Sequence, residues 1–286
     1  MPRFAANRCF ALCKEEKTNG KKRIVEKNEI KKVLLYVANG KTNVNEAFDL
    51  INGVQFEDLG FAKPDFARKA RKGVSEVIYA QKKTVNQITG IAKSLKNHGQ
   101  ENILITRLEK EKADEIKKEI DLKYFDDARI GIIGKMPEKK VGKIVIAAAG
   151  TSDIPVAQEA AVTAEMLGNN VVRLYDVGVV GICRLFSYMD EIESANVIIA
   201  IAGMEGALAS VIGGLAPCPV IGVPTSVGYG TAFGGVTALL SMLNSCSSGV
   251  RVSPIQCISL ITEYSGKVFA KSCICVKMVL CDASIS

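Results

Sequence analysis

The second half of the chain alternates continuous apolar runs with segments that end in glycine. The stretch KIVIAAAGTSDIPVAQEAAVTAEMLGNNVVRLYDVG, which begins at Lys143, has the pattern of a buried strand, a glycine turn, a helix that ends at Gly168 and another strand. The alternation recurs in ANVIIAIAGMEGALASVIGGL and in PVIGVPTSVGYGTAFGGVTALLSMLN. Continuous apolar strands between helices are typical of a parallel sheet that is covered on both faces. We therefore predict a doubly wound α/β fold for this half.

The first half of the chain has a mixed pattern. Apolar residues recur at helical spacing near the start of residues 28–52, and a second short helix is predicted from Asn45. A strand in VIY, a helix from Thr84 to Asn97 and a strand in ENILITR, which ends at Arg107, follow. This order predicts a smaller α+β domain ahead of the α/β domain.

The composition is that of a globular protein, with 48% hydrophobic and 23% charged residues. The charge is uneven, because residues 1–143 carry 31 Lys and Arg against 20 Asp and Glu, whereas residues 144–286 carry 6 against 10. A basic half is compatible with nucleic-acid binding, but its lysines alternate with acids, as in EKEKADEIKKEID, and no aromatic residues are interleaved with them. We expect no nucleic-acid partner, and the imbalance equally suits a small anionic ligand.

The apolar runs and the cysteines of the sequence argue against a membrane or secreted protein. The longest apolar runs, such as VIIAIAGM from Val197, are interrupted well before the ~18 residues that a membrane span requires. The apolar patch at the N-terminus is interrupted by Asn7 and Arg8 and is too short for a secretory signal. Nine cysteines, an odd number in a chain of this size, are better interpreted as reduced thiols than as a disulfide framework. We expect a cytoplasmic protein without a membrane partner.

Three predicted strand ends in the second half carry polar or glycine-rich turns, where α/β sheets bind ligands. They are Gly150 to Asp153, Gly203 to Gly206 and the loop GVPTSVGYG from Gly222 to Gly230. Ser152 or Asp153 in the first turn can cap a helix, or the turn can seat a phosphate. Glu205 follows seven apolar residues, where an unpartnered carboxylate is costly, which favours a chemical role.

Two further features carry candidate chemistry. Asp65, Arg68 and Arg71 recur at three-residue steps, either as an exposed row of ion pairs or as charges for a ligand. Cys246 lies just past an apolar helix and is a candidate nucleophile, although a small buried residue is the ordinary role of a free cysteine. A lone His98 and scattered acids form no ligand cluster for a metal.

The motifs GTSD, AGMEGAL, VPTSVGYG and ALLSMLNSC, with DFARKARKGVSEVIYAQKKT upstream, resemble one family when taken together. It comprises the pyridinium-3,5-biscarboxylic acid mononucleotide synthases, carboxylases that begin the synthesis of the nickel-pincer cofactor of lactate racemase. The resemblance covers roughly residues 55–249. Its second domain is in turn similar to aminoimidazole ribonucleotide carboxylase/mutase of purine synthesis, which shares the Gly-x-Ser-Asp turn and lacks the cysteine.

This resemblance implies a domain organisation and a fold. We expect an unmatched extension at 1–25, an N-terminal helical or α+β domain at 26–140, and a carboxylase-like, flavodoxin-like α/β domain at 141–249. Residues 250–286 depart from the family and are predicted to be a divergent tail, in which a strand begins at Val250 and Pro254 interrupts it.

The resemblance also implies the reaction and the site. Nicotinic acid adenine dinucleotide would be carboxylated at pyridine C5 by CO2 or bicarbonate, and its phosphoanhydride would be hydrolysed to release AMP. Cys246 would add to the ring as a thiolate and Glu205 would remove the C5 proton. The predicted substrate-binding residues are Gly150, Thr151, Ser152, Asp153, Arg71, Lys83, Gly203, Met204, Thr225, Ser226 and Gly228.

We expect no tightly bound cofactor, and Mg2+ assistance of the hydrolysis is compatible with that chemistry. The resemblance and the glycine-rich, apolar α/β domain both favour a homo-oligomer with sites near subunit boundaries. Two alternatives stay open: an aminoimidazole ribonucleotide carboxylase/mutase, and a nucleotide-binding protein without turnover.

Overall fold

The structure, a computed structural model, describes residues 27–44, 47–48, 56–69 and 73–253 of the 286-residue chain. The predicted extension 1–25 and most of the predicted tail lie outside these residues. Helix α2 (Lys27–Ala38) confirms the first helix predicted in residues 28–52. The start of the second helix, predicted at Asn45, falls on residues that are not described.

A five-stranded, all-parallel sheet forms the second half, in the order β6-β5-β7-β8-β9. Its strands are β5 (Val141–Ala148), β6 (Asn169–Leu174), β7 (Val197–Ala202), β8 (Val220–Pro224) and β9 (Val250–Val252). The predicted doubly wound, flavodoxin-like α/β fold is confirmed. The strand predicted to start at Val250 is also confirmed as β9, which pairs with β8 at the edge of the sheet.

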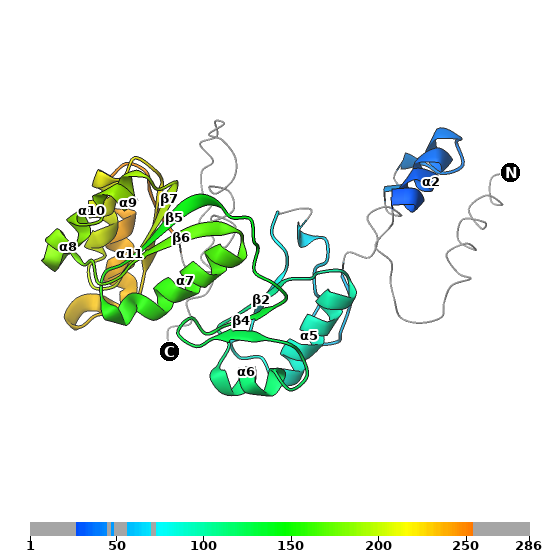
Figure 1. Cartoon of the computed structure of the whole chain (residues 1–286), viewed down its shortest axis with the longest axis horizontal. Coiled ribbons are helices and arrows are strands. Elements are labelled where there is room, and N and C mark those ends of the chain that lie inside the picture. Colours follow the sequence, from blue (N-terminus) through cyan, green and yellow to red (C-terminus); the bar gives the residue numbers. More distant parts are fainter. Residues whose placement is uncertain (1–26, 45–46, 49–55, 70–72, 254–286) are drawn as a thin grey trace.

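Helices cover both faces of this sheet (Figure 1). The helices are α7 (Ile154–Met166), α8 (Ile182–Phe186), α9 (Met189–Glu193), α10 (Ala207–Leu215) and α11 (Val236–Leu243). Helix α7 packs on one face through four alanines, Ala157, Ala160, Ala161 and Ala164, whose small side chains allow a close approach to the strands. Helices α8 to α11 contribute to the core on the opposite face.

A second, mixed sheet precedes the first in the chain, with the order β1-β2-β4-β3. Its strands are β1 (Val77–Tyr79), β2 (Ile103–Thr106), β3 (Lys123–Phe125) and β4 (Ile130–Ile133), and its helices are α5 (Val85–Asn97) and α6 (Lys110–Ile116). Strands β1 and β2 are parallel and the other pairings are antiparallel. The predicted strands in VIY and ENILITR and the helix after Thr84 are confirmed, whereas β3 and β4 were not predicted.

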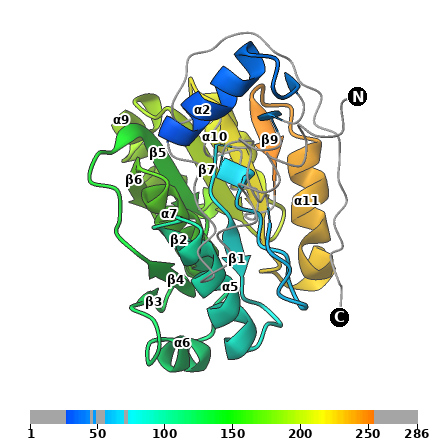
Figure 2. The ribbon, with the colours of Figure 1, turned by 90° about the vertical axis from the view of Figure 1, so that its right-hand side faces the viewer.

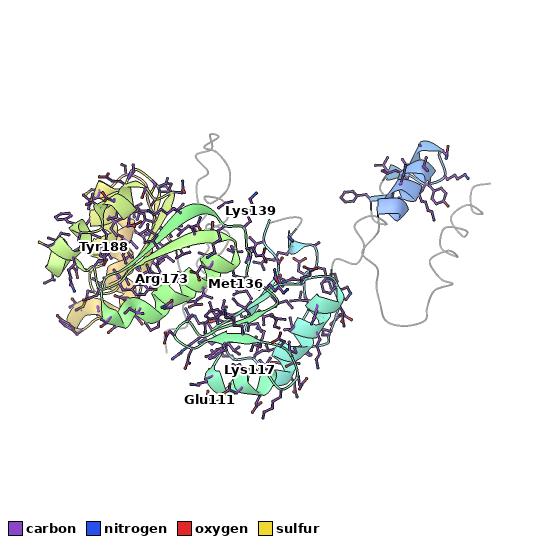
Figure 3. The ribbon with its side chains drawn as sticks, viewed as in Figure 1. Glu111, Lys117, Met136, Lys139, Arg173 and Tyr188 are labelled. Carbon is purple, nitrogen blue, oxygen red and sulfur yellow. The ribbon has the colours of Figure 1, made fainter. Side chains whose placement is uncertain are left out.

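Helix α7 lies between the two sheets (Figure 1). The side of α7 that faces away from the parallel sheet carries Val162 and Met166, which pack against Leu104, Ile130 and Ile132 of the mixed sheet. Met136, in the connection between the sheets, also packs in this seam (Figure 3). The two halves therefore share one helix and are held in a defined orientation.

The seam also contains a charged pair. Glu159 of α7 has a side chain only 8% exposed and lies 2.9 Å from Nε of Arg107, the residue after β2. Burial raises the pKa of Glu159, and the Arg107 guanidinium opposes that change by favouring the carboxylate. None of the described helices combines the length and the apolar character that a membrane crossing needs.

Candidate active site

The carboxyl ends of the parallel strands converge on a topological switch point. From β5 the chain passes through α7 to β6 on one side, and then returns past β5 to β7 on the other side. Open α/β sheets bind ligands in the crevice that such a reversal creates. The loops at this edge are residues 149–153 after β5, 203–206 after β7 and 225–235 after β8, and we call them the carboxyl-edge loops.

A buried carboxylate ties two of these loops together. Asp153 is 3% exposed, and its Oδ1 accepts a hydrogen bond of 2.7 Å from the hydroxyl of Thr225. Its Oδ2 accepts a hydrogen bond of 3.1 Å from the backbone N–H of Gly150. Burial raises the pKa of Asp153, and the Thr225 and Gly150 hydrogen bonds oppose this increase. Asp153 therefore links the loop after β5 to the loop after β8.

The loop after β7 passes between these two and has no room for a side chain at Gly203. A Cβ there would lie 2.0 Å from the carbonyl oxygen of Val227 and 2.8 Å from Oγ1 of Thr225. The next residue, Met204, has a left-handed backbone with φ of 53°, and its N–H donates to Val227 O at 2.8 Å. A non-glycine residue in this region is uncommon and marks a conformation that its surroundings impose. Gly203 and Met204 are therefore structural parts of the edge.

Other residues of these loops are exposed and available to a ligand. They are Thr151, Ser152, Glu205, Ser226 and Gly228. Helix α7 has no side-chain cap, so the alternative in which Ser152 caps that helix is not observed. Glu205 directly precedes Gly206, the N-cap of α10, and is the only charged residue in the sequence between 194 and 250. The loops after β5, β7 and β8 thus offer the exposed carboxylate of Glu205 and several exposed hydroxyl groups.

Cys246 follows helix α11 (Val236–Leu243). Helix α11 begins where Gly235 approaches the carbonyl oxygen of Thr225 and ends at Leu243, and beyond that end Ser245 and Ser247 hydrogen-bond to Ser210, one turn into α10 from Gly206. Cys246 is exposed beyond that end. The structure brings together the predicted residues of the three loops, and the hydrogen bonds of Ser245 and Ser247 to Ser210 hold the segment around Cys246 beside α10, the helix that follows the loop after β7.

Two other cysteines are described. Cys183 in α8 is exposed, and Cys218 is half-buried, where burial raises the pKa of its thiol. A raised pKa leaves less thiolate, so Cys218 is a weaker candidate nucleophile.

The basic residues that were predicted to contribute from the first half are Lys83 and Arg71, and Arg68 lies near them in the sequence. Lys83 follows β1, and its Nζ donates to Tyr79 O at 2.8 Å. Among the described residues, no hydrogen bond or ion pair joins Lys83 to the carboxyl-edge loops. Arg71 lies outside the described residues. Arg68 forms an ion pair of 3.2 Å with Glu76, which is a different partner from the row predicted with Asp65.

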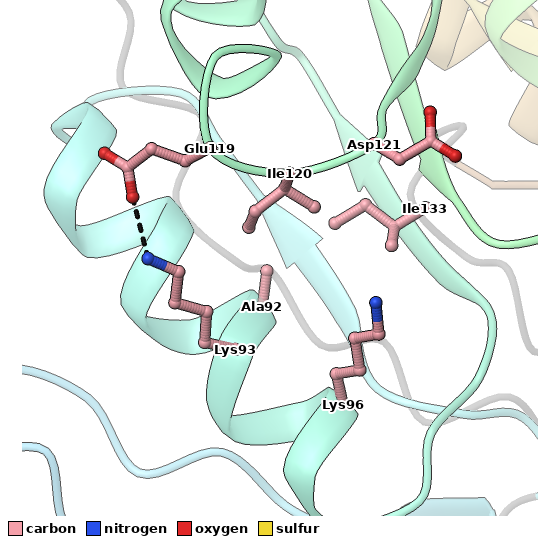
Figure 4. A pocket seen from close by; sticks show the side chains of 7 residues that line it. All are labelled: Ala92, Lys93, Lys96, Glu119, Ile120, Asp121 and Ile133. Carbon is pink, nitrogen blue, oxygen red and sulfur yellow. Dashed lines mark hydrogen bonds and ion pairs between the residues drawn. The ribbon is translucent and has the colours of Figure 1, made fainter.

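A hollow of about 250 Å³ lies elsewhere, on the mixed-sheet half (Figure 4). It is lined by Ala92, Lys93, Lys96, Glu119, Ile120, Asp121 and Ile133. Lys93 and Glu119 close one side as an ion pair of 2.7 Å, and the Lys96 ammonium points into the hollow (Figure 4). Its volume is below the ~300–1,000 Å³ of ordinary ligand pockets, and it contains no predicted nucleophile or base. It is not the candidate active site.

Two connections at the site were not predicted from the sequence. The bond between Asp153 and Thr225 joins residues 72 positions apart, and the Val227 carbonyl accepts from Met204. A signal for the first was present, since Asp and Thr each follow an apolar run at a predicted strand end.

Comparison with known families defines the class of this fold and site. The AIR carboxylase family matches residues 143–270, which include the whole parallel sheet and its carboxyl-edge loops. The second half is therefore a carboxylase-type domain related to AIR carboxylase. The match continues past Gly249 into the segment predicted to be a divergent tail.

The first half identifies the family. The LarB/PurE-like N-terminal domain matches residues 56–135. This domain followed by an AIR carboxylase domain is the LarB architecture, and the chain belongs to the LarB family. Uncharacterized protein MJ0165 of Methanocaldococcus jannaschii is 41% identical over 239 residues, covering 79% of this chain and 91% of that protein. The family resemblance drawn from the motifs is confirmed.

Proposed function

We propose that this protein carboxylates the pyridinium ring of nicotinic acid adenine dinucleotide at C5 and hydrolyses its phosphoanhydride to release AMP. The observation that carries the proposal is Glu205, an exposed carboxylate in the loop after β7, within a chain of the LarB family. The product would supply the synthesis of the nickel-pincer cofactor. CO2 or bicarbonate is the co-substrate.

The chemistry requires a nucleophile because a pyridinium ring is electron-poor and does not attack CO2. Addition of the Cys246 thiolate forms a C4–S bond and moves a ring electron pair to nitrogen, so that C5 becomes nucleophilic. C5 then bonds to the carbon of CO2. Glu205 takes the C5 proton, the electrons return through the ring, and the C4–S bond breaks to regenerate the thiolate and the aromatic ring. Water then cleaves the phosphoanhydride.

The remaining site residues have binding and positioning roles in this proposal. The exposed hydroxyls of Thr151, Ser152 and Ser226 would contact ribose or phosphate. Asp153 would act by holding the loops that carry Ser152 and Ser226, because both of its oxygens are engaged within the protein. Lys83 and Arg71 would add positive charge from the first half.

A metal has a limited place in this proposal. The described residues contain no group of three His, Cys, Asp or Glu side chains suited to hold one ion. Assistance by Mg2+ stays an expectation from the chemistry of anhydride hydrolysis, and no step is routed through it.

The test is incubation with nicotinic acid adenine dinucleotide and labelled bicarbonate, followed by chromatography for AMP and for the labelled, carboxylated pyridinium. We expect both products from the wild-type protein. Cys246→Ser should abolish carboxylation while the substrate still binds. Cys183→Ser is the matched control and should retain turnover, because Cys183 is an exposed thiol on a different helix. Full turnover by Cys246→Ser would end the role assigned to Cys246.

The base is tested separately. Glu205→Gln should stop the reaction after thiolate addition, so that a covalent adduct accumulates on Cys246. Intact-protein mass spectrometry would detect this adduct. An unmodified Glu205→Gln protein with normal turnover would leave Glu205 a structural residue of the turn.

A second candidate function follows from the AIR carboxylase match at residues 143–270. It predicts carboxylation of aminoimidazole ribonucleotide, without AMP release. The same assay with that nucleotide distinguishes the two reactions. Binding of either nucleotide without any product would instead favour a binding protein.

A further inference from the structure

One side of α10 faces the part of the chain that carries Cys246. It consists of Gly206, Ser210 and Gly213, which recur at steps of four and three residues and so lie on one side of the helix. We call it the α10 face. Helix α11 and strand β9, which precede and follow Cys246 in the chain, both lie beside α10 (Figure 2). The segment that contains Cys246 therefore joins two elements that pack against this helix.

The contacts on the α10 face follow the order of the sequence. At its first position, Gly206, a Cβ would lie 3.1 Å from the side chain of Met242 in α11. At its last position, Gly213, a Cβ would lie 2.9 Å from Cβ of Ser247 and 2.5 Å from Cγ2 of Val250, the first residue of β9. The absence of a side chain at these two positions allows the close approach. The chain from α11 to β9 thus runs along the α10 face from its beginning to its end.

Ser210, the middle residue of the α10 face, hydrogen-bonds to both neighbours of Cys246. Its Oγ lies 2.8 Å from Oγ of Ser245, and its carbonyl oxygen accepts a hydrogen bond of 2.6 Å from Oγ of Ser247. The backbone N–H of Ser247 also donates to Oγ of Ser245 at 3.3 Å. Both of these serines are half-buried, whereas Cys246 between them is exposed. The three serines therefore hold the backbone on both sides of Cys246 and leave its sulfur accessible.

Helix α10 also carries the proposed base. Glu205 directly precedes Gly206, the N-cap of α10, and Ser210 follows Gly206 by about 6 Å along the axis at 1.5 Å per residue. In the proposed reaction the Cys246 thiolate bonds to C4 and the base removes the proton of the neighbouring C5. Both groups must keep a fixed place relative to one ring, because a misplacement of about 1 Å can slow a reaction on the order of 100-fold. An exposed segment has no such fixed place unless it is bound to a rigid element.

Building on the proposed function, we propose that Ser210 is a positioning residue, which holds the Cys246 thiolate for its addition to C4 of the pyridinium ring through Ser245 and Ser247. Ser210 does not touch the substrate in this role. Its hydrogen bonds order the segment before the substrate arrives, so that the thiol is in place when the addition begins. Loss of these bonds should therefore slow thiolate addition without weakening substrate binding.

Steady-state kinetics separates positioning from binding. Ser210→Ala removes the hydroxyl that meets Ser245, and α10 should persist because alanine is the best helix former. We expect kcat for carboxylation to fall about tenfold or more and KM to change by less than about twofold. Ser210→Thr, which keeps a hydroxyl, should recover most of the rate.

Ser187→Ala is the matched control for these variants. Its Oγ donates a hydrogen bond of 2.7 Å to the carbonyl oxygen of Arg184 at the end of α8, so the substitution removes a comparable bond from another helix. Both kcat and KM should stay at the wild-type values. An unchanged kcat for Ser210→Ala, beside a wild type that turns over, would overturn the proposal.

A second measurement does not depend on activity and so separates this inference from the proposed function. Hydrogen exchange with mass spectrometry reports how readily the backbone of residues 244–249 opens. In the double variant Ser210→Ala/Ser247→Ala this segment should exchange about tenfold faster or more, because both side-chain bonds to α10 are lost. The same segment in Ser187→Ala should exchange as in the wild type. Unchanged exchange in the double variant would overturn the proposal even if the wild type releases AMP. Faster exchange beside a wild type that forms no product would refute the proposed function and leave the attachment to α10 in place.

Discussion

Replacing Thr225 by Val removes one hydrogen bond and little else, because the two side chains have nearly the same shape. Thr225 is 7% exposed, and its hydroxyl donates to Asp153 Oδ1 at 2.7 Å. Without it, the buried carboxylate keeps only the Gly150 N–H as a described partner. A hydrogen bond to a charged group contributes ~1.5–3 kcal/mol. We expect Thr225→Val to lower the free energy of unfolding by this amount near neutral pH.

The free energy of unfolding that Thr225→Val loses should be larger at high pH than at low pH. Burial raises the pKa of Asp153 in the folded state, against the opposing effects of Thr225 and Gly150. The folded protein therefore holds this proton more tightly than the unfolded chain, and the contribution of Asp153 to stability falls as pH rises through the folded pKa. Removing the Thr225 hydroxyl raises that pKa further. The destabilisation should be largest above the folded pKa and should shrink at lower pH, where Asp153 is protonated in both proteins.

Urea unfolding of the wild type and of Thr225→Val, measured at a series of pH values from neutral downward, follows this difference directly. The matched control is Thr89→Val, because Thr89 is 5% exposed and its Oγ1 has no hydrogen-bond partner among the residues that the structure describes. We expect that control to be neutral or stabilising. Equal destabilisation by both substitutions, or a loss for Thr225→Val that does not change with pH, would refute the reasoning.

Two further predictions concern the loop after β7 and the seam. Gly203→Ala would bring a Cβ within 2.0 Å of Val227 O, so we expect the free energy of unfolding to fall by ~1–3 kcal/mol and turnover to decrease. The control Gly214→Ala, where a Cβ has nothing within 4 Å, should be stabilising because alanine favours a helix more than glycine does. Thermal unfolding and AMP release are compared for the two variants. Arg107→Met should lower the free energy of unfolding by ~3 kcal/mol, because it leaves the buried Glu159 carboxylate without its ion-pair partner. Glu159→Gln should lower it by less than ~1 kcal/mol, because Arg107 is partly solvated. Equal losses for the two variants in urea unfolding would contradict this asymmetry.

The regular elements of the second half were predictable because their signals are local. Strands β5 and β7 are continuous apolar runs, and Gly168, with φ of +86°, ends the turn after α7 as its position in the sequence indicates. In the first half, Thr84 and Gln87 form the capping box that starts α5. Each of these features depends on residues a few positions apart.

The elements that were missed are short or depend on distant contacts. Strands β3 and β4 have three and four residues and follow a lysine-rich segment, so their alternation is too brief to detect. The exact start of α11 at Val236, after Gly234 and Gly235 adopt left-handed conformations, was likewise not specified by the sequence pattern.

The types of residue at the candidate site were predictable, but their arrangement was not. Ser152, Glu205 and Ser226 are exposed at one edge because parallel strands end on the same side. Asp153 is instead buried and accepts a hydrogen bond from Thr225, which is distant in the sequence and lies beside it only in the folded sheet. The position of Cys246 depends on the hydrogen bonds of Ser245 and Ser247 to Ser210, which lies more than 30 residues earlier and which the motif by itself does not reveal.

Helix α7 makes the two halves interdependent in folding. Its alanines close the core of the parallel sheet, and Val162 and Met166 on its other side close the core over Leu104 and Ile130. Removing either sheet would open the remaining core to water at this helix. The two sheets should therefore unfold in a single cooperative transition, and the amide hydrogens of α7 should exchange with solvent only through that global opening.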